Sequence, residues 1–291
     1  MTESDWLTEG FEQHRARLRA VAYRMLGSLA EAEDAVQEAW LRLSRSDASG
    51  VDNLGAWLTT IVARVCLNVL RSRKARREEP MGVHVPDPVI SRADGPTPED
   101  EALLADSVGL ALQVVLETLT PAERLAFVLH DMFGLPFDQI APMVGRSPAM
   151  ARQLASRARR RVRGVSVHAP DPDIARQREV VDAFFAAAHD GDFDALVAVL
   201  DPDVVRRVDT GSGIIVELRG AENIARGAMA ASLFGLDVRP ALINGAAGWV
   251  SLRDGQLFSI GALTLRNGRI TMIDILLDRA RLARVDLDSR L

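Results

Sequence analysis

The chain has 291 residues, 48% of them hydrophobic and 26% charged, a balance that supports about two or three globular domains with cores of their own. Its single cysteine, Cys66, excludes an internal disulfide framework, and the five histidines never recur at a metal-ligand spacing, so we expect neither a metal nor another cofactor. The N-terminus carries no basic-then-apolar signal, and Arg64 interrupts the most apolar run. We therefore expect a cytoplasmic protein with no membrane association.

The net charge of −5 argues against nucleic acid when the chain is taken whole, but the basic residues are concentrated in two acid-free clusters. The first cluster, in residues 64–77, holds Arg64, Arg71, Arg73, Lys74, Arg76 and Arg77; the second, in residues 139–170, holds Arg146, Arg152, Arg157, Arg159, Arg160, Arg161 and Arg163. Two such clusters, each closing a helical pattern, indicate either a nucleic-acid contact surface or two solvated helix faces.

Proline content marks the domain boundaries. Five of the thirteen prolines fall within residues 78–100, which predicts a linker without regular structure, and a second break follows the arginine cluster. We therefore expect the following division: a first domain at 1–77, a linker at 78–101, a second domain at 102–166, a linker at 167–173 and a third domain at 174–291.

The first segment is predicted to be all helix. Ser28 and Glu31 form a capping-box pattern, and apolar residues then recur at helical spacing through Leu43. A second helix is expected over residues 54–77, after a polar loop.

The second segment is predicted to be helical as well. Its first stripe consists of Val108, Leu112, Val115, Leu116 and Leu119, and Thr120 with Glu123 then predicts a capped helix that ends at Gly134. A short helix over 137–144 and a tight turn lead to a long basic helix. That helix starts with a Ser147 cap and with Pro148 in its first turn, so the arrangement is a helix-turn-helix pattern, although Pro142 lies inside the short helix.

The third segment changes character. Helices are expected over 174–188, after Asp192 and over 221–233, and six alternating segments predict strands. Turns at Asn244-Gly245, Asp254-Gly255 and Asn267-Gly268 are strong hairpin signals. The whole chain therefore predicts two all-α domains followed by an α+β domain, cone-shaped, with a curved antiparallel sheet wrapped around a helix.

Longer motifs resemble a known family. Residues 22–28 (Ala-Tyr-Arg-Met-Leu-Gly-Ser) and 32–41 (Ala-Glu-Asp-Ala-Val-Gln-Glu-Ala-Trp-Leu) resemble region two of extracytoplasmic-function sigma factors, and the 54–77 helix resembles their promoter-melting helix. Residues 104–163 resemble their region four. The remainder is similar to the SnoaL-like extension, of the nuclear-transport-factor type, that one subgroup carries.

The resemblance implies an alternative sigma factor that binds core RNA polymerase through the beta-prime clamp helices and the beta flap and initiates transcription at minus-thirty-five and minus-ten promoter elements. It implies no catalytic activity, and a C-terminal domain that regulates in cis. The residues implied to bind polymerase are Asp34, Gln37, Glu38 and Leu41. Those implied to bind promoter DNA are Trp57, Arg64, Asn68, Arg71, Ser147, Met150, Arg152, Gln153 and Arg157, with the 46–54 loop holding an unstacked base.

The regulatory contact is implied by three motifs. The subgroup's Trp-Leu-Pro-Glu-Pro linker signature corresponds here to His84-Val-Pro-Asp-Pro88, without the tryptophan, and the glycine-rich motif corresponds to Asp209–Gly213. The tail motif corresponds to Leu277–Leu282. The residues implied to make this contact are His84, Pro86, Asp87, Pro88, Asp209, Gly211 and Gly213.

Three alternatives stay open on the sequence. Trp57 could be a core residue. The protein could be a helix-turn-helix regulator whose cone domain senses a small-molecule ligand, with no polymerase role. The third alternative is a cone-domain enzyme that uses Asp203, Asp209 or Asp274 as a general base.

Overall fold

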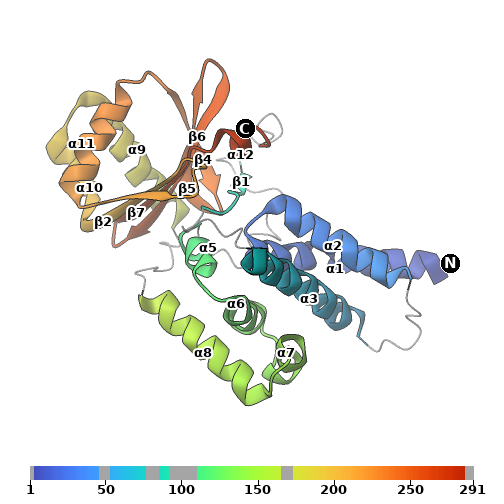
Figure 1. The fold of residues 1–291 in the computed structure, drawn as a ribbon. Coiled ribbons are helices and arrows are strands. Elements are labelled where there is room, and N and C mark those ends of the chain that lie inside the picture. The colour runs from blue at the N-terminus through green and yellow to red at the C-terminus, as the bar shows by residue number, and fades with distance from the viewer. Residues whose placement is uncertain (1–2, 46–52, 77–84, 92–109, 165–172, 286–291) are drawn as a thin grey trace. The chain divides into compact units, whose positions relative to one another are not determined.

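The computed structural model describes residues 3–45, 53–76, 85–91, 110–164 and 173–285 (Figure 1). The chain divides into two compact units. We call the first the helical unit (Met1–Glu79, Glu101–Asp106 and Val115–Ser166) and the second the sheet unit (Pro80–Asp100, Ser107–Val114 and Val167–Leu291). Most of the predicted linker, and residues 107–114 of the second predicted segment, thus belong to the sheet unit.

The helical unit starts with three helices, α1 (Glu3–Leu26), α2 (Leu29–Leu43) and α3 (Leu54–Arg76), which pack on one another. The predicted stripe of α2 is buried as expected, except for Trp40, which is only partly buried. The predicted capping box at Ser28 is wrong: its hydroxyl makes no cap hydrogen bond in the described structure. Glu31, the predicted second member of this capping box, is engaged elsewhere: its carboxylate pairs with the Arg73 guanidinium of α3.

α3 is the core helix of this group. Leu58, Val62 and Cys66 are fully buried along one side, and burial raises the pKa of the Cys66 thiol to about 12. By length and composition, Leu54–Arg73 could also cross a membrane, which differs from the expectation that Arg64 rules this out. A buried core helix passes the same test, and α3 packs against both α1 and α2.

The second half of the helical unit contains the predicted helix-turn-helix. Its elements are the end of α5 (Leu110–Glu117), α6 (Pro121–Phe127), the π-helix η2 (Val128–Met132), α7 (Phe137–Val144) and α8 (Pro148–Gly164). The capping box of Thr120 and Glu123 is confirmed, and Gly145 ends α7 in the left-handed conformation at φ 67°. Val108, predicted to start the first stripe, lies outside the described residues.

Buried Arg124 of α6 connects α5 and α1. Its guanidinium donates to both carboxylate oxygens of Glu117, at 2.8 and 3.1 Å, and to the carbonyl oxygen of Met25 at 2.8 Å. A bidentate ion pair with an additional backbone acceptor is the arrangement in which a buried guanidinium is tolerated.

The sheet unit contains one seven-stranded sheet in the order β1-β4-β5-β6-β7-β2-β3. The strands are β1 (Ile90–Ser91), β2 (Leu200–Asp209), β3 (Ile215–Arg219), β4 (Asp237–Ile243), β5 (Ala246–Arg253), β6 (Gln256–Arg266) and β7 (Arg269–Leu276); the helices are α9 (Ile174–Asp190), α10 (Phe193–Val199), α11 (Ala221–Ser232) and α12 (Arg279–Leu282). All pairs are antiparallel except β2 with β7, which are parallel, so the sheet is mixed rather than wholly antiparallel.

The three predicted hairpin turns are confirmed. Asn244, Asp254 and Asn267 have φ of 52°, 53° and 51°, and the glycine after each also has positive φ, as a type I′ turn requires. These turns connect β4 to β7 into a meander.

The two faces of the sheet have separate cores. On one face α9, α10 and α11 cover a cluster that includes Phe184, Trp249 and Ile273 (Figure 1). The other face carries a second cluster, in which Val85, Ile90 and Leu110 pack with residues of β4 to β7 and α12. The prediction that residues 78–101 lack regular structure is therefore wrong at Ile90–Ser91, which form β1 against β4, with the Ile90 side chain in this second core.

Candidate functional sites

The outer face of α2 carries the predicted polymerase-binding residues. Asp34, Gln37 and Leu41 are exposed, and their spacing of three and four residues places them on one side of the helix. Leu41 is 37% exposed and supplies the apolar part of this face. Glu38 is half-buried and accepts a 2.8 Å hydrogen bond from the Arg42 Nε. The face thus presents an acidic side chain, an amide and an apolar side chain.

A groove of about 350 Å³ lies beside this face, between α1 and α2. Its lining includes the Phe11 and Trp40 rings, whose centroids are 5.0 Å apart, as well as Val36 and Gln37. Its edge carries an ion pair between the Arg15 guanidinium and the Glu33 carboxylate at 2.6 Å. The groove offers an apolar floor with charged edges, which is a suitable shape for the side chains of a partner helix.

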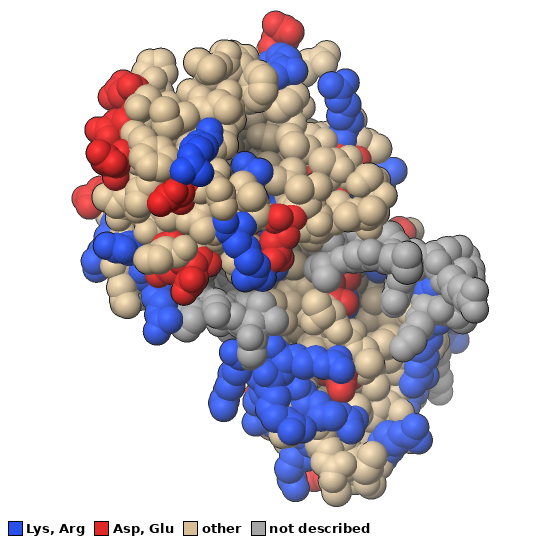
Figure 2. Space-filling view, turned by 60° about the vertical axis from the view of Figure 1, so that its left-hand side comes forward, with Lys and Arg blue, Asp and Glu red and all other residues tan. Residues whose placement is uncertain are grey.

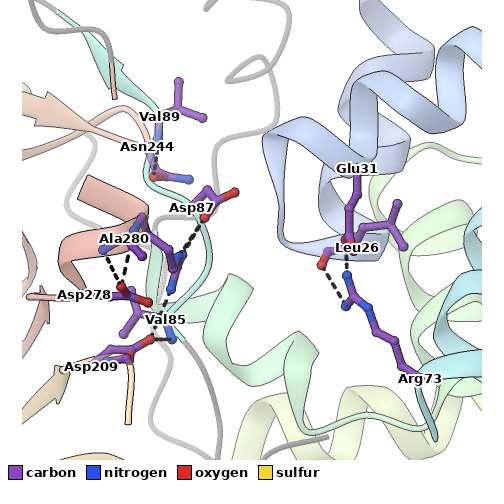
Figure 3. A network of polar contacts seen from close by, with 12 residues as sticks. Leu26, Glu31, Arg73, Val85, Asp87, Val89, Asp209, Asn244, Asp278 and Ala280 are labelled. Atoms are coloured by element: carbon purple, nitrogen blue, oxygen red, sulfur yellow. Dashed lines mark hydrogen bonds and ion pairs between the residues drawn. The ribbon is translucent and has the colours of Figure 1, made fainter. Parts of the chain in front are cut away.

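α3 carries the predicted promoter-melting residues. Arg64, Asn68 and Arg71 are exposed, whereas Trp57 is half-buried, so its ring is neither a free stacking platform nor a full core residue. Arg73, another member of the first basic cluster, donates to the Leu26 carbonyl oxygen and pairs with Glu31 (Figure 3). Most of the 46–54 loop lies outside the described residues.

α8 is the predicted recognition helix. Ser147 caps it by accepting a hydrogen bond from the Met150 backbone N–H at 3.3 Å, and Met150, Arg152 and Gln153 are exposed on its first turns. The Arg152 guanidinium lies 5.3 Å from the centre of the Phe137 ring, which orients it by a cation–π contact. Figure 2 shows the basic side chains gathered over this helix, and further exposed ones are Arg157, Arg160, Arg161 and Arg163.

Arg157, predicted to contact DNA, has a partner inside the protein. Its Nε donates to the buried Glu123 carboxylate at 3.1 Å, and Arg161 donates to the other oxygen of that carboxylate at 3.0 Å. Burial alone would raise the pKa of Glu123, but hydrogen bonds from Thr120 and the charges of Arg161 and Arg157 lower it overall. Glu123 therefore holds α8 against α6 and sets the orientation of α8.

A polar network in the sheet unit holds residues 85–91, which we call the linker strand (Figure 3). The Arg281 guanidinium on α12 donates to the Asp87 carboxylate at 2.7 and 2.9 Å and to the Asp209 carboxylate at 3.1 Å. Asp209, only 1% exposed, also accepts from the Val85 backbone N–H at 3.1 Å. Further along, the Val89 N–H donates to the Asn244 side-chain oxygen at 3.0 Å.

The three motifs of the predicted regulatory contact therefore come together in part. Asp87 and Asp209 share one arginine, and Pro86 and Pro88 are buried beside them. Gly211 has φ of 80°, and a Cβ there would lie 2.6 Å from the Asp278 carboxyl carbon, so the motif requires glycine at this point. Gly213 also has positive φ, and His84 lies outside the described residues.

Sequence reasoning missed the residue at the centre of this network. Arg281 lies in the Leu277–Leu282 tail motif, which pointed to the region without indicating which side chain acts. For Asn244, the sequence predicts only a turn residue. A local pattern gives no signal for either role, because the partners of each residue lie far away in the chain.

The three carboxylates of the enzyme alternative lie in different settings. Asp203 is exposed, Asp209 belongs to the network above, and Asp274 is paired with Arg207 at 2.6 Å. The register places Asp209 and Asp274 on the sheet face opposite α9–α11. Over the described residues, no group of three or more His, Cys, Asp or Glu side chains is arranged to hold a metal ion.

Comparison with known proteins decides the family. The Sigma-70 region 2 model matches residues 11–76 and the Sigma-70 region 4 model matches residues 109–162. The chain is 40% identical to the ECF RNA polymerase sigma factor SigJ of Mycobacterium tuberculosis, over 89% of this chain and 88% of that protein. The chain belongs to the ECF RNA polymerase sigma factors.

The relatives of this sigma factor also share its C-terminal part. The probable ECF sigma factor SigI of Mycobacterium tuberculosis is 36% identical over 97% of both chains. The crystal structure of SigJ matches with a TM-score of 0.76 at 35% identity, over 95% of this chain and 98% of that one. The sheet unit is therefore part of an architecture that extends over the whole of these relatives.

Proposed function

We propose that this sigma factor binds core RNA polymerase through the α2 face and directs it to promoters, with α3 at the minus-ten element and α8 at the minus-thirty-five element. The main support is that this chain, a member of the family, has both an acidic, partly apolar face on α2 and exposed arginines along α8. A DNA-binding regulator that does not bind polymerase would have no need of the α2 face.

Two features support docking of polymerase on α2. Asp34 and Leu41 are exposed on the same side of the helix, which suits a basic, amphipathic partner such as the beta-prime clamp helices. The groove between α1 and α2 lies directly beside Gln37, so a partner helix on the α2 face could insert a side chain there. A contact of region four with the beta flap belongs to the same proposal.

Promoter reading is supported by the chemistry of the exposed positions. Arg152 can donate two hydrogen bonds to a guanine edge, and Gln153 can pair with an adenine edge. On α3, Arg64 and Arg71 are seven residues apart on one face and are suited to backbone phosphates. The paired Arg157 acts in this proposal as a positioning residue for α8.

The C-terminal domain is proposed to restrain activity in cis. The linker strand lies in the chain between regions two and four, and its side chains complete the core of the sheet unit together with Leu110 at the start of region four. Any rearrangement of the two regions that pulls on this segment must therefore break β1 and the Arg281 network. We propose no enzymatic activity for the domain and a cytoplasmic location for the protein.

Run-off transcription tests the proposal. With core polymerase and a pool of genomic promoters, we expect specific transcripts from the full chain, and loss of about tenfold or more in Asp34→Arg, equivalent to about 1.4 kcal/mol of binding. Glu179→Arg makes the same charge change at an exposed position of α9 and should leave transcription unchanged. A folded wild-type chain that produces no transcript would contradict the proposal and favour a ligand-sensing regulator.

A second variant tests the recognition helix. Arg152→Ala should lower transcription from the cognate promoter about tenfold and relax the preference at one base position of the minus-thirty-five element, because a bidentate base contact contributes about 1–3 kcal/mol. The matched control is Arg160→Ala on the same helix, which should weaken binding evenly across sequences and reduce its salt dependence. Unchanged promoter footprints in Arg152→Ala would refute the assignment.

A further inference from the structure

Arg206 of β2 has an unusual position in the sheet unit. In the register of the sheet it lies beside Leu218 of β3 and Ile273 of β7, and both of these side chains pack into the core beneath α9, α10 and α11. Residues directly opposite one another in paired strands point to the same face. Arg206 therefore extends from the helix-covered face, among apolar neighbours.

α11 leaves room for this side chain. A Cβ at Gly227 would lie 2.9 Å from the Arg206 Nη1, so only glycine permits the helix and the guanidinium to approach this closely. The Nε is fully buried, whereas the residue as a whole is only partly buried. One edge of the guanidinium is thus covered, and part of the side chain stays accessible from outside.

No partner of Arg206 is found in the described part of the chain, either as an ion pair or as a hydrogen bond to the Nε. The neighbouring residue shows that the fold can satisfy an arginine here: Arg207 points to the other face and donates two hydrogen bonds to Asp274, at 2.6 and 3.1 Å. Burial lowers the pKa of Arg206, and no nearby carboxylate raises it again. An arginine nonetheless stays charged, and a partly buried charge without a counter-ion is costly.

The surface beyond Arg206 on the same face is apolar and uncovered. Val208 is paired with Val216, which is 52% exposed, and Ile214, just before the start of β3, is 63% exposed. α11 runs in the same direction, since Gly220 bonds to Val204 and Gly227 lies at Arg206. Its end therefore leads toward these residues, and the side chains that follow it, Leu233 and Phe234, are exposed as well.

We infer that this face of the sheet unit binds a small amphipathic organic acid, whose carboxylate pairs with Arg206 and whose apolar chain lies on Val208, Val216 and Ile214. A carboxylate matches the planar donor set of a guanidinium, and the low dielectric around a covered arginine strengthens the pair. The apolar chain would cover side chains that water now contacts. A polar anion such as free phosphate would leave these side chains uncovered.

Isothermal titration of the full-length protein tests this inference, with decanoate below its micelle concentration as the probe. We expect saturable binding, and affinity about tenfold or more weaker for decanol and for decyltrimethylammonium, which have the same chain without the carboxylate. These comparisons need no variant. The measurement uses the sigma factor alone, so its outcome is separate from that of the transcription proposal.

Three variants locate the site. Arg206→Gln should weaken decanoate binding about tenfold, and Gly227→Ala should do the same, because the added methyl group displaces the guanidinium. Arg219→Gln is the matched control, an exposed arginine on the opposite face whose loss should change nothing. Thermal unfolding verifies that each variant folds.

Absence of saturable decanoate binding to the wild-type protein would overturn the inference. So would equal affinity for decanoate and decanol, which would indicate non-specific apolar adsorption. Unchanged affinity in a folded Arg206→Gln protein would overturn it as well, and if that variant does not fold, the same criterion applies to Gly227→Ala. An acidic peptide that binds where decanoate does not would point to a macromolecular partner instead.

Discussion

Arg281→Ala is expected to raise run-off transcription severalfold, if the linker strand is restrained as proposed. The substitution removes the two bonds to Asp87 and leaves the buried Asp209 carboxylate without its cation. Losing one partner of a partly buried pair destabilises by about 2 kcal/mol or more, and here that cost falls on the attachment of the linker strand. Detached, the segment between regions two and four is free to follow polymerase and promoter.

Hydrogen exchange provides the structural measurement for this variant. The backbone amide of Val85 donates to Asp209, so its exchange should accelerate together with that of the linker strand, while amides in the centre of β6 stay protected. Arg279→Ala, on the same short helix but exposed, is the control and should leave both transcription and exchange unchanged. Faster exchange without any change in transcription would eliminate the regulatory role and leave the network a structural one.

Truncation after residue 173 is a less clean test. It removes the strands and α12 that cover Val85, Ile90 and Leu110, so three core side chains would become exposed on the remaining chain. A change in activity would then mix release of restraint with aggregation. Arg281→Ala avoids this mixed effect because it leaves the second core of the sheet unit in place.

Arg207→Ala is expected to lower the free energy of unfolding of the sheet unit by about 3–5 kcal/mol, because it leaves Asp274 buried and unpaired. Asp274 is 1% exposed, and burial already raises the pKa of its carboxyl although Arg207 opposes this effect. Without Arg207 the folded-state pKa rises further above the unfolded value, so the folded state holds a proton that the unfolded state releases. The free energy of unfolding of the variant should therefore fall further as pH rises from the unfolded-state pKa of Asp274 to its folded-state pKa.

Urea unfolding, followed by the fluorescence of Trp249 in a background with the other tryptophans replaced, measures this effect. The double variant Arg207→Met with Asp274→Leu should recover most of the loss, since an apolar pair of similar volume needs no counter-charge. Arg219→Ala, which breaks an exposed pair with Glu217, should cost less than about 1 kcal/mol. A loss below about 1 kcal/mol in Arg207→Ala would show that water or another group compensates Asp274.

Much of the local structure could be predicted from the sequence. The helix over 137–144 has the predicted bounds, Ser147 and Asp192 cap their helices, and all three Asn-Gly and Asp-Gly turns form as expected. These features depend on residues within about four positions of one another, so the sequence contains the whole interaction. The capping box at Ser28 fails for the opposite reason, because its glutamate is engaged by an arginine 42 positions away.

The sequence by itself determined the two helical regions, the α+β domain and the exposed faces that carry the polymerase and promoter proposals, because helical periodicity and charge clustering are local properties. Only the tertiary structure decided that Asp87 and Arg281, 194 positions apart, hold the linker strand. It also decided that β2 and β7 pair in parallel. In the described structure, Arg207 pairs with a residue 67 positions away, whereas the Arg206 Nε has no hydrogen-bond partner. Pairings of this kind follow from sheet register and from which face each strand residue takes, and a shift of one residue in β2 would exchange the roles of these two arginines.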